Sequence, residues 1–489
     1  MRLTWIAPSL AGICFASAAR GQFVAPGGAP QAPRETSMAV PASSPAAGVQ
    51  GPISRPFSGS VPTGQATAAV VPLSLGEAIE RGLKYNLGLL LEEQSSRLAQ
   101  GARYRARSAL LPNVAAGISE TGQQINLAAF GFSGFPGIGN IVGPFNIFDT
   151  RASVSQPILD LRALRNDRTA SENVRATQYS YDNAKSVVVL AVTSLYLEAI
   201  AGAARIDAAQ AQLATAQALY DQAVDLRKAG VIPGIEVIRA QVEKQAQQQR
   251  LIFFQNEYEK EKLNLARAIG LPLGQQIRLS DALSYTAPPA ISQQQALEQA
   301  YHSRADYQNA LALVRAAESA RRAASAEALP SVSLDGNYGD IGPRIYNSHG
   351  TFLVAASVRI PVFQGGRVRG DVLQADALLR QRTAESEDLR ARIDYEIRTA
   401  FLDLKSAGDR VEVARSTLDL AKRQLAQSQD RFAAGIADNI EVVQAQDALA
   451  TATENYISSL YAYNLAKVSL ARALGFPQGL SKPFLEGTR

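Results

Sequence analysis

Two glutamates that occupy the same place in a repeated phrase are the first candidates for chemistry in this chain. Residues 229–241 read AGVIPGIEVIRAQ and residues 434–446 read AGIADNIEVVQAQ, so Glu236 of the first copy corresponds to Glu441 of the second. In both copies the phrase follows a long helical run, and its Glu lies where a new helix would begin. A carboxylate in a first helical turn suits the helix dipole, and the sequence DNIE at 438–441 resembles a capping box. One interpretation of both carboxylates is therefore that they help to start helices.

The residues that usually carry enzyme chemistry are scarce. Cys14 is the only cysteine, and His302 and His349 are the only histidines, far apart in the sequence. This composition disfavours a histidine-based metal or catalytic cluster. The many carboxylates on helical stretches are more typical of solvated faces and interhelical pairs than of acid–base catalysts. We therefore expect neither an enzyme nor a bound cofactor or metal.

Glycine and basic residues do not indicate a nucleotide or nucleic-acid site. In GFSGFPGIGNIVG (131–143), Gly137, Gly139 and Gly143 miss the spacing of a phosphate-binding loop, and we predict an apolar loop between two strands. The formal net charge is +5, and the basic residues form no run of five or more. We expect no nucleic-acid partner.

The N-terminus is typical of an exported protein. Residues 1–21 combine Arg2, an apolar stretch and the small-residue sequence ASA at 16–18, which predicts a secretory signal peptide. Ile13, rather than a small residue, precedes Cys14, so lipidation of this cysteine is not expected.

A leader of biased composition follows the signal. Residues 22–72 are rich in Pro, Ala, Gly and Ser, and we predict that they are disordered. No later segment has eighteen consecutive apolar residues, so we expect no transmembrane helix after the signal. Two classes remain: a soluble exported protein, or a membrane protein built on a β-barrel.

The rest of the chain is an internal duplication. LARAIGLP at 265–272 returns as LARALGFP at 470–477, and ALLPNV at 109–114 returns as EALPSV at 327–332. These pairs and the repeated phrase define a first repeat at 73–272 and a second at 273–477, followed by a tail at 478–489.

Both repeats have the same order of predicted elements. A helix ends at a Leu-Pro, two strands follow, and a proline-free helical run then leads to the repeated phrase and a returning helix. The predicted strands are about 112–126, 145–157, 330–341 and 350–362. The predicted helices are 75–109, 160–228 and 235–269 in the first repeat, and 292–328, 366–432 and 440–474 in the second. Each long run would span about 100 Å.

The strands alternate between apolar and polar residues. Val332, Leu334 and Tyr338 fall on one face of their strand, whereas Ser333 and Asp335 fall on the other. Such a period of two over about ten residues is typical of half-buried or lipid-facing strands.

Four strands are too few to close a barrel, which needs about eight. An open sheet in lipid would leave backbone groups without hydrogen bonds, so several chains would have to share one barrel. Two chains would make a tight, filled barrel, whereas three chains would supply twelve strands. An exported coiled-coil structural protein is the alternative, but it has no use for paired strands. A stand-alone nutrient porin would not need helices of this length.

At this point the sequence resembles the TolC-type outer-membrane efflux proteins. The resemblance covers about residues 73–477 and is carried by the duplicated Leu-Pro before a strand, IPVFQGGRVRGDVLQADALL after one, the two repeated phrases and the two LARA-x-G-x-P endings. The first repeat departs from the pattern in QPILDLRALRND, which lacks the Gly-Gly of the second.

The resemblance implies a mixed α+β membrane protein that works as a homotrimer. Each chain would give four strands to a twelve-stranded barrel in the outer membrane of a Gram-negative-type cell, in contact with its lipid. The helices would form a periplasmic barrel of about 100 Å. Such proteins are exit ducts of tripartite efflux or type I secretion systems and dock on a periplasmic adaptor (membrane fusion) protein and an inner-membrane pump.

The resemblance also implies roles for the repeated phrases, which would form the hairpin tips farthest from the outer membrane. By position, Gly230, Val231, Gly435 and Ile436 correspond to adaptor contacts.

The second-repeat tip of the family lines the aperture with two acidic positions, which here match Glu441 and Gln444, so only the first is acidic. Glu236 is a further candidate for the gate. Ala437 occupies a position where the family can carry a basic partner, which leaves an ionic contact at the tip without its expected cation.

Overall fold

The computed structural model describes residues 57, 59–131, 139–287, 291–434, 436 and 439–475. The chain divides into two compact units, Met1–Gly51 and Pro52–Arg489, and everything described here belongs to the second. The predicted signal peptide, most of the predicted leader, part of the glycine-rich segment 131–143 and the C-terminal tail lie outside the described residues.

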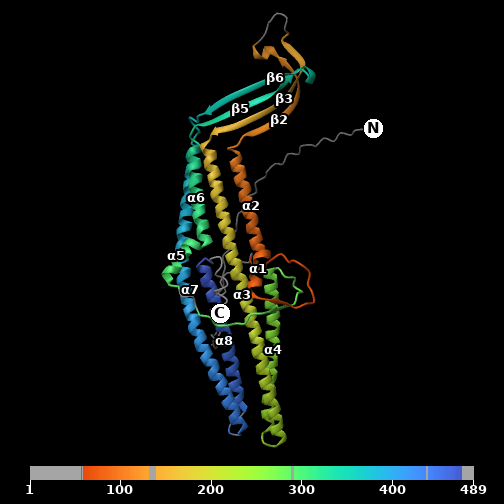
Figure 1. Cartoon of the computed structure of the whole chain (residues 1–489), viewed down its shortest axis with the longest axis vertical. Coiled ribbons are helices and arrows are strands. Elements are labelled where there is room, and N and C mark those ends of the chain that lie inside the picture. The colour runs from red at the N-terminus through yellow and green to blue at the C-terminus, as the bar shows by residue number, and fades with distance from the viewer. Residues whose placement is uncertain are drawn as a thin grey trace, which may run out of the picture. The chain divides into compact units, whose positions relative to one another are not determined.

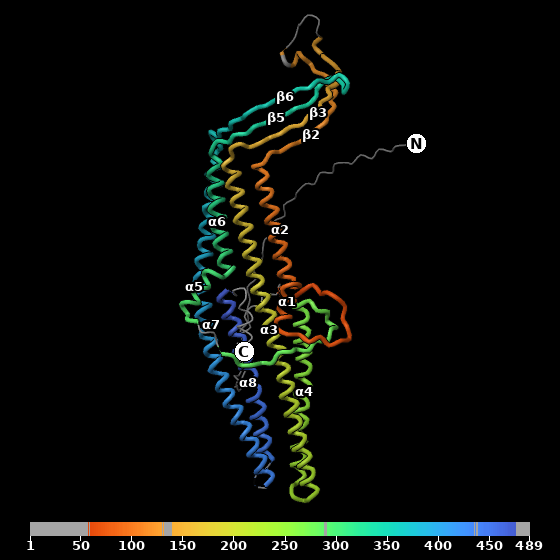
Figure 2. The backbone as a smooth tube through the Cα atoms, viewed as in Figure 1, coloured from red at the N-terminus to blue at the C-terminus, as the bar shows by residue number. Residues whose placement is uncertain are grey.

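Both repeats contain helices, two strands and a long helical hairpin in the same order (Figures 1 and 2). The first repeat comprises α1 (Leu75–Tyr85), α2 (Leu87–Ser108), β2 (Asn113–Asn126), β3 (Ile141–Leu159), α3 (Leu161–Lys228) and α4 (Gly234–Ile269). The second comprises α5 (Gln293–Ser303), α6 (Ala305–Ala326), β5 (Ser331–Gly342), β6 (His349–Arg359), α7 (Arg367–Ala433) and α8 (Asn439–Ala473). Two 3₁₀ turns, η2 (Leu127–Phe130) and η3 (Ile345–Asn347), lie beyond β2 and β5.

The first helix of each repeat, which we predicted as continuous, is broken in two. Asn86 separates α1 from α2, and Arg304 separates α5 from α6; both have extended backbone conformations. Buried side chains hold these breaks. The Asn86 side chain accepts from the Gly88 amide at 3.0 Å and donates to the Phe57 carbonyl at 2.6 Å, while Arg304 forms ion pairs with carboxylates on α6 and α7.

The four long strands form one antiparallel sheet in the order β2-β3-β5-β6. Its register puts Ala116, Ala152, Tyr338 and Phe352 side by side across the strands, because each is the direct partner of the next. The apolar residues that alternate along each strand therefore lie on one face of the sheet.

The opposite face of the sheet carries a hydrogen-bonded polar network. Arg151 donates to the Asn337 side chain at 2.6 Å, and Ser155 donates to Asp335 at 2.6 Å. A sheet with one apolar and one polar face is what a strand between lipid and a water-filled lumen requires.

The helices form a wall one layer thick that continues from the sheet (Figure 1). Next to the sheet the neighbours are α2, α3, α6 and α7 in that order, whereas farther away they are α4, α3, α8 and α7. Three apolar clusters hold this wall together: one around Tyr196 on α3, one around Tyr463 on α8, and one between the hairpins near their tips.

Part of the predicted leader belongs to the fold. The Val61 amide donates to the Tyr85 carbonyl at 3.0 Å, and β1 (Val71–Leu73) pairs in parallel with β4 (Ile277–Leu279). The sequence predicted a leader to residue 72, and this boundary is corrected because residues 59–73 are held by backbone hydrogen bonds to distant parts of the chain.

An apolar stretch of α3 is explained by packing. One 18-residue window of α3 has a mean hydropathy of 1.9, long and apolar enough to cross a membrane, but 61% of the window is buried in the structure. Val188, Val192 and Tyr196 of α3 are fully buried against α1 and α4. The high hydropathy of α3 therefore reflects a protein core.

A half-buried carboxylate, that of Glu261, lies where α4 packs on α3. Burial, followed by the charge of Glu198, raises the pKa of Glu261 to about 7. The carboxylate fills the space beside Gly202, where a Cβ atom would overlap it. One of its oxygens, Oε2, is buried without a hydrogen-bond partner in the part of the chain that the structure describes.

We predict that Glu261 makes stability depend on pH. Because folding raises its pKa, the native state binds the proton more tightly, and this contribution is lost as pH rises from about 4.5 to about 7, on the order of 2 kcal/mol per chain. Glu261→Gln should flatten the fall in thermal midpoint between pH 5 and pH 8. Glu259→Gln, at an exposed position on the same helix, should keep the wild-type profile. Identical pH profiles for wild type and Glu261→Gln would contradict this prediction.

Candidate functional site at the hairpin tips

The first tip is closed by a glycine with a left-handed backbone. Helix α3 ends at Lys228 and is capped by Ala229, and the next residue, Gly230, has φ of 74°. The Gly230 amide donates to the Arg227 carbonyl and the Val231 amide to the Leu226 carbonyl, both at 2.9 Å. These two bonds form a Schellman ending, which satisfies carbonyls that the helix leaves open and explains the glycine.

The second tip shows the same long-range closing bond. Its Ile436 amide donates to the Arg431 carbonyl at 2.9 Å, in the position equivalent to the bond made by Val231. Gly435, Ala437 and Asp438 lie outside the described residues, so the predicted contact at Gly435 and the predicted capping box fall there too.

The two tips lie at the same end of the helical wall (Figure 2), and each has an exposed aliphatic side chain. Val231 is 65% exposed and Ile436 is 71% exposed. Two such side chains at adjacent turns form a small apolar surface that a partner could cover.

The two hairpins are joined just above their tips. Asn439, at the start of α8, is buried and donates to the Glu236 carbonyl of the other hairpin at 3.3 Å. The third apolar cluster lies in the same part of the hairpins and is made of Leu219, Leu425, Phe432, Val442 and Ala445. Glu236 and Glu441 therefore lie on hairpins that are packed against each other near the tips.

Glu236 is largely covered by protein. Its side chain is 13% exposed and pairs with Arg239, one turn along α4, at 2.6 Å. Its second oxygen, Oε2, is buried and has no hydrogen-bond partner among the described residues. Glu236 thus occupies the first turn of α4, as the helix-start interpretation requires, and offers little surface to a lumen.

Glu441 is in a different environment. Its side chain is 41% exposed, and its Oε1 atom lies 3.2 Å from Nε of Arg431 on α7. The hydroxyl of buried Ser428 lies 3.5 Å from the same oxygen. Gln444, one turn further along α8, is exposed. Glu441 and Gln444 are therefore both accessible, and Glu441 already has a cationic neighbour.

The two tips have exchanged the position of their arginine. Counting from the aligned glutamates, Arg431 corresponds to Leu226, and Gln444 corresponds to Arg239. The first tip consequently pairs its Glu along α4, while the second pairs its Glu across the hairpin to α7. Each of these two glutamates has one arginine partner, but only the pair of the second tip joins the two arms of a hairpin.

Sequence reasoning missed Arg431. It lies ten residues before Glu441, outside the repeated phrase, and it becomes a neighbour only because the turn folds back. Comparison of the two repeats one turn upstream of the phrase would have found it, since Leu226 and Arg431 differ so strongly in character.

The tips suit a gating or docking role better than a chemical one. Their groups are single carboxylate–guanidinium pairs beside exposed aliphatic side chains. Among the described residues no group of three His, Cys, Asp or Glu side chains is arranged to hold a metal ion.

The fold and the tips together define a class of protein: a membrane-channel subunit whose two-faced sheet continues into long helical hairpins. The similarity of the chain to known proteins supports this class. Residues 79–271 and 296–476 match the family of outer membrane efflux proteins. The chain belongs to this family. It is an efflux channel of the outer membrane with its helices in the periplasm, and not an enzyme.

Similarity to individual proteins is distant but extensive. The chain is 25% identical over 346 residues to the pyoverdine export outer membrane protein OpmQ of Pseudomonas putida, covering 67% of this chain and 70% of the relative. It is 23% identical over 378 residues to the toluene efflux pump outer membrane protein TtgF of the same species, with 76% of each covered. The crystal structure of the Campylobacter jejuni CmeC outer membrane channel superposes with a TM-score of 0.72 at 18% identity, covering 82% of this chain and 85% of that one.

Proposed function

We propose that three copies of this chain form one channel, which is the outer-membrane exit duct of a tripartite efflux system. The observation that carries this proposal is the sheet. Its outer strands, β2 and β6, are long and have no partner on their outer sides within the described residues. In lipid those backbone groups need hydrogen bonds, and pairing β2 of one copy with β6 of the next supplies them.

The helical wall has matching free edges. Beside the sheet its outermost helices are α2 and α7, and farther away they are α4 and α7. Helix α7 carries an exposed apolar stripe on the side opposite its buried face, made of Tyr395, Leu402, Val413 and Leu420. Helix α4 also exposes apolar residues, namely Ile238, Val242, Ile252 and Phe253. A head-to-tail ring would cover both sets.

We predict that Leu402→Glu prevents trimer formation. The change replaces an apolar contact between copies by a charge, which should cost roughly 2 kcal/mol or more at each of the interfaces. Light scattering of detergent-purified protein should show monomers. Lys405→Glu, at an exposed position of α7 outside the stripe, should leave a trimer. A normal trimer for Leu402→Glu would contradict the proposed edge.

We further propose that the tips dock on a periplasmic adaptor that links the channel to an inner-membrane pump. Support comes from the exposed Val231 and Ile436, which lie at the end of the hairpins farthest from the sheet (Figure 1). Gly230 keeps the first turn free of a side chain that a partner would meet, and Gly435 is the residue at the matching position of the second repeat. The relatives named above export pyoverdine or toluene, so we propose a small organic cargo rather than a secreted polypeptide.

Ile436→Asp should reduce efflux by placing a charge in an apolar contact. Ile345→Asp makes the same change in the turn after β5, at the other end of the fold, and should leave efflux unchanged. Drug or solvent tolerance of cells that carry each variant is the measurement. A cysteine introduced at position 436, but not at 345, should crosslink to a periplasmic protein. Full efflux with Ile436→Asp and no crosslink from position 436 would remove this tip from the docking surface.

We propose that Glu441 lines the narrow end of the channel, with Gln444 beside it. Threefold symmetry would bring three copies of Glu441 around one axis, where their charges attract cations. Arg431 offsets part of that charge through its 3.2 Å contact. Glu236, which is largely covered and paired along its own helix, would contribute less to the gate.

We predict that Glu441→Gln and Arg431→Gln shift ion selectivity in opposite directions. In single-channel recordings from purified trimers, Glu441→Gln should lower cation preference and block by divalent ions. Arg431→Gln should raise both, roughly twofold to tenfold, because it leaves the three carboxylates without their cations. Glu236→Gln is the matched control and should have the smaller effect. If Glu441→Gln and Arg431→Gln both leave selectivity unaltered, Glu441 serves only to start α8.

A further inference from the structure

A single buried carboxylate of the second repeat links α6 to the first turns of α3 and α7. Glu327, the capping residue at the end of α6, has a side chain that is 5% exposed. It pairs with Arg162 at 3.0 Å and also with Arg367. These arginines lie in the first turns of α3 and α7, and they correspond to each other when counted back from the aligned tips. Glu327 thus fixes both long helices where the sheet ends.

The first repeat lacks this carboxylate. The aligned phrases ALLPNV and EALPSV put Ala109 in the position of Glu327, and both residues cap the helix that leads into a strand. Both repeats therefore have this helix–strand junction, but only the second has a carboxylate there.

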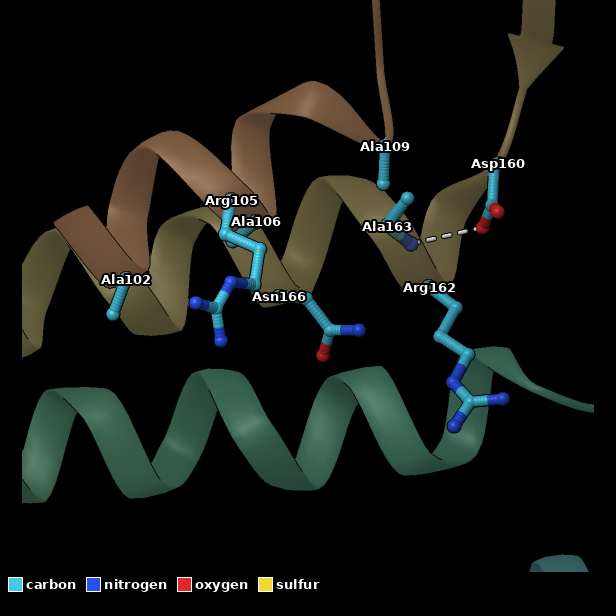
Figure 3. Close-up of a pocket in the computed structure, with 8 residues that line it drawn as sticks. All are labelled: Ala102, Arg105, Ala106, Ala109, Asp160, Arg162, Ala163 and Asn166. Atoms are coloured by element: carbon cyan, nitrogen blue, oxygen red, sulfur yellow. Dashed lines mark hydrogen bonds between the residues drawn. The ribbon is translucent and has the colours of Figure 1, made fainter. Parts of the chain in front are cut away.

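An open pocket of about 460 Å³ lies at the place of the missing carboxylate (Figure 3). Its lining is mainly small and apolar, from Ala102, Ala106 and Ala109 of α2 and Ala163 of α3. The polar residues that line it are Arg105, Arg162, Asn166 and Asp160. The Asp160 carboxylate is already engaged, because it accepts from the Ala163 amide at 2.8 Å and so caps α3.

The polar groups of the pocket are suited to an anion. Arg105 from α2 and Asn166 from α3 point to the same side of these helices in Figure 3, and Arg162 lies one turn away. Among the described residues Arg105 forms no ion pair, whereas Arg162 shares Glu327 with Arg367. The junction therefore carries more guanidinium than carboxylate. Forked guanidinium groups match the oxygens of a phosphate.

We propose that this pocket binds the phosphate of an anionic phospholipid, in place of the carboxylate that the first repeat lacks. The pocket lies where α2 meets β2 and β3 meets α3, and the apolar side chains of Leu111 and Ile158 next to it are exposed. If the sheet spans the membrane, as proposed above, lipid headgroups lie at this depth. The alanine lining suits the glycerol and upper acyl chain.

The test compares lipids on purified, delipidated full-length protein. Added phosphatidylglycerol should raise the thermal midpoint of the wild type at lower concentration than phosphatidylcholine does. Arg105→Ala should raise the half-saturating concentration of phosphatidylglycerol roughly tenfold or more, since a charge-assisted hydrogen bond is lost. Arg103→Ala removes an exposed arginine of the same helix that does not line the pocket, and it should leave the response unchanged.

A second variant restores the symmetry of the two repeats. Ala109→Glu should raise the midpoint without lipid, because it supplies the internal partner of Arg162, and it should abolish the response to phosphatidylglycerol. Ala109→Gln fills the same space without charge and should abolish the response without raising the midpoint. Light scattering on each sample reports trimer formation separately, so a failure of assembly is distinguished from a failure of this site.

Three results would overturn the proposal. Equal losses for Arg103→Ala and Arg105→Ala would mean a general attraction of lipid to basic residues. A response to inorganic phosphate as large as that to phosphatidylglycerol would assign the pocket to free phosphate. If wild-type trimers respond to neither phosphatidylglycerol nor inorganic phosphate, and if the Ala109→Glu variant no longer forms trimers, a neighbouring copy fills the pocket.

Discussion

Backbone hydrogen bonds at the edges of one four-stranded sheet constrain everything else in this fold. The sheet runs β2-β3-β5-β6, and its register collects the apolar side chains on one face and a polar network on the other. A sheet of that kind is suited to the boundary between lipid and water, yet lipid cannot satisfy its outer strands. The same chain, repeated around an axis, can satisfy them. The lateral apolar stripes on α4 and α7 then become contacts between copies.

The duplication supplies equivalent hairpins, and the charges distinguish them. At the tips the arginine that pairs with the glutamate comes from α4 in the first repeat and from α7 in the second. At the junction with the sheet, Glu327 ties two helices together, while Ala109 leaves a pocket. A wall of nearly equivalent helices can carry different functions at corresponding positions because a few charged residues have been exchanged while the apolar packing was kept.

The sequence predicted the elements whose causes are local. Proline after leucine ends α2 and α6, strict alternation gives β5 and β6, and a glycine closes the first tip. It did not predict features that depend on distant neighbours. Asn86 breaks a helix because its side chain meets Phe57, and β1 is ordered because β4 lies beside it. Arg431 was missed for the same reason, since only the turn brings it to Glu441.

Disulfide crosslinking between β2 and β6 tests the shared sheet most directly. Within one chain these strands are separated by two others, roughly 14 Å, which is too far for a disulfide. With a cysteine replacing Ala116 on β2, a second cysteine should be scanned along β6 at Phe352, Val354 and Ala356. At the matching register, oxidation in the outer membrane should give a ladder of covalent dimers and trimers that stops at three. Monomers alone at every register, or a ladder that continues beyond three, would contradict a barrel made of three chains.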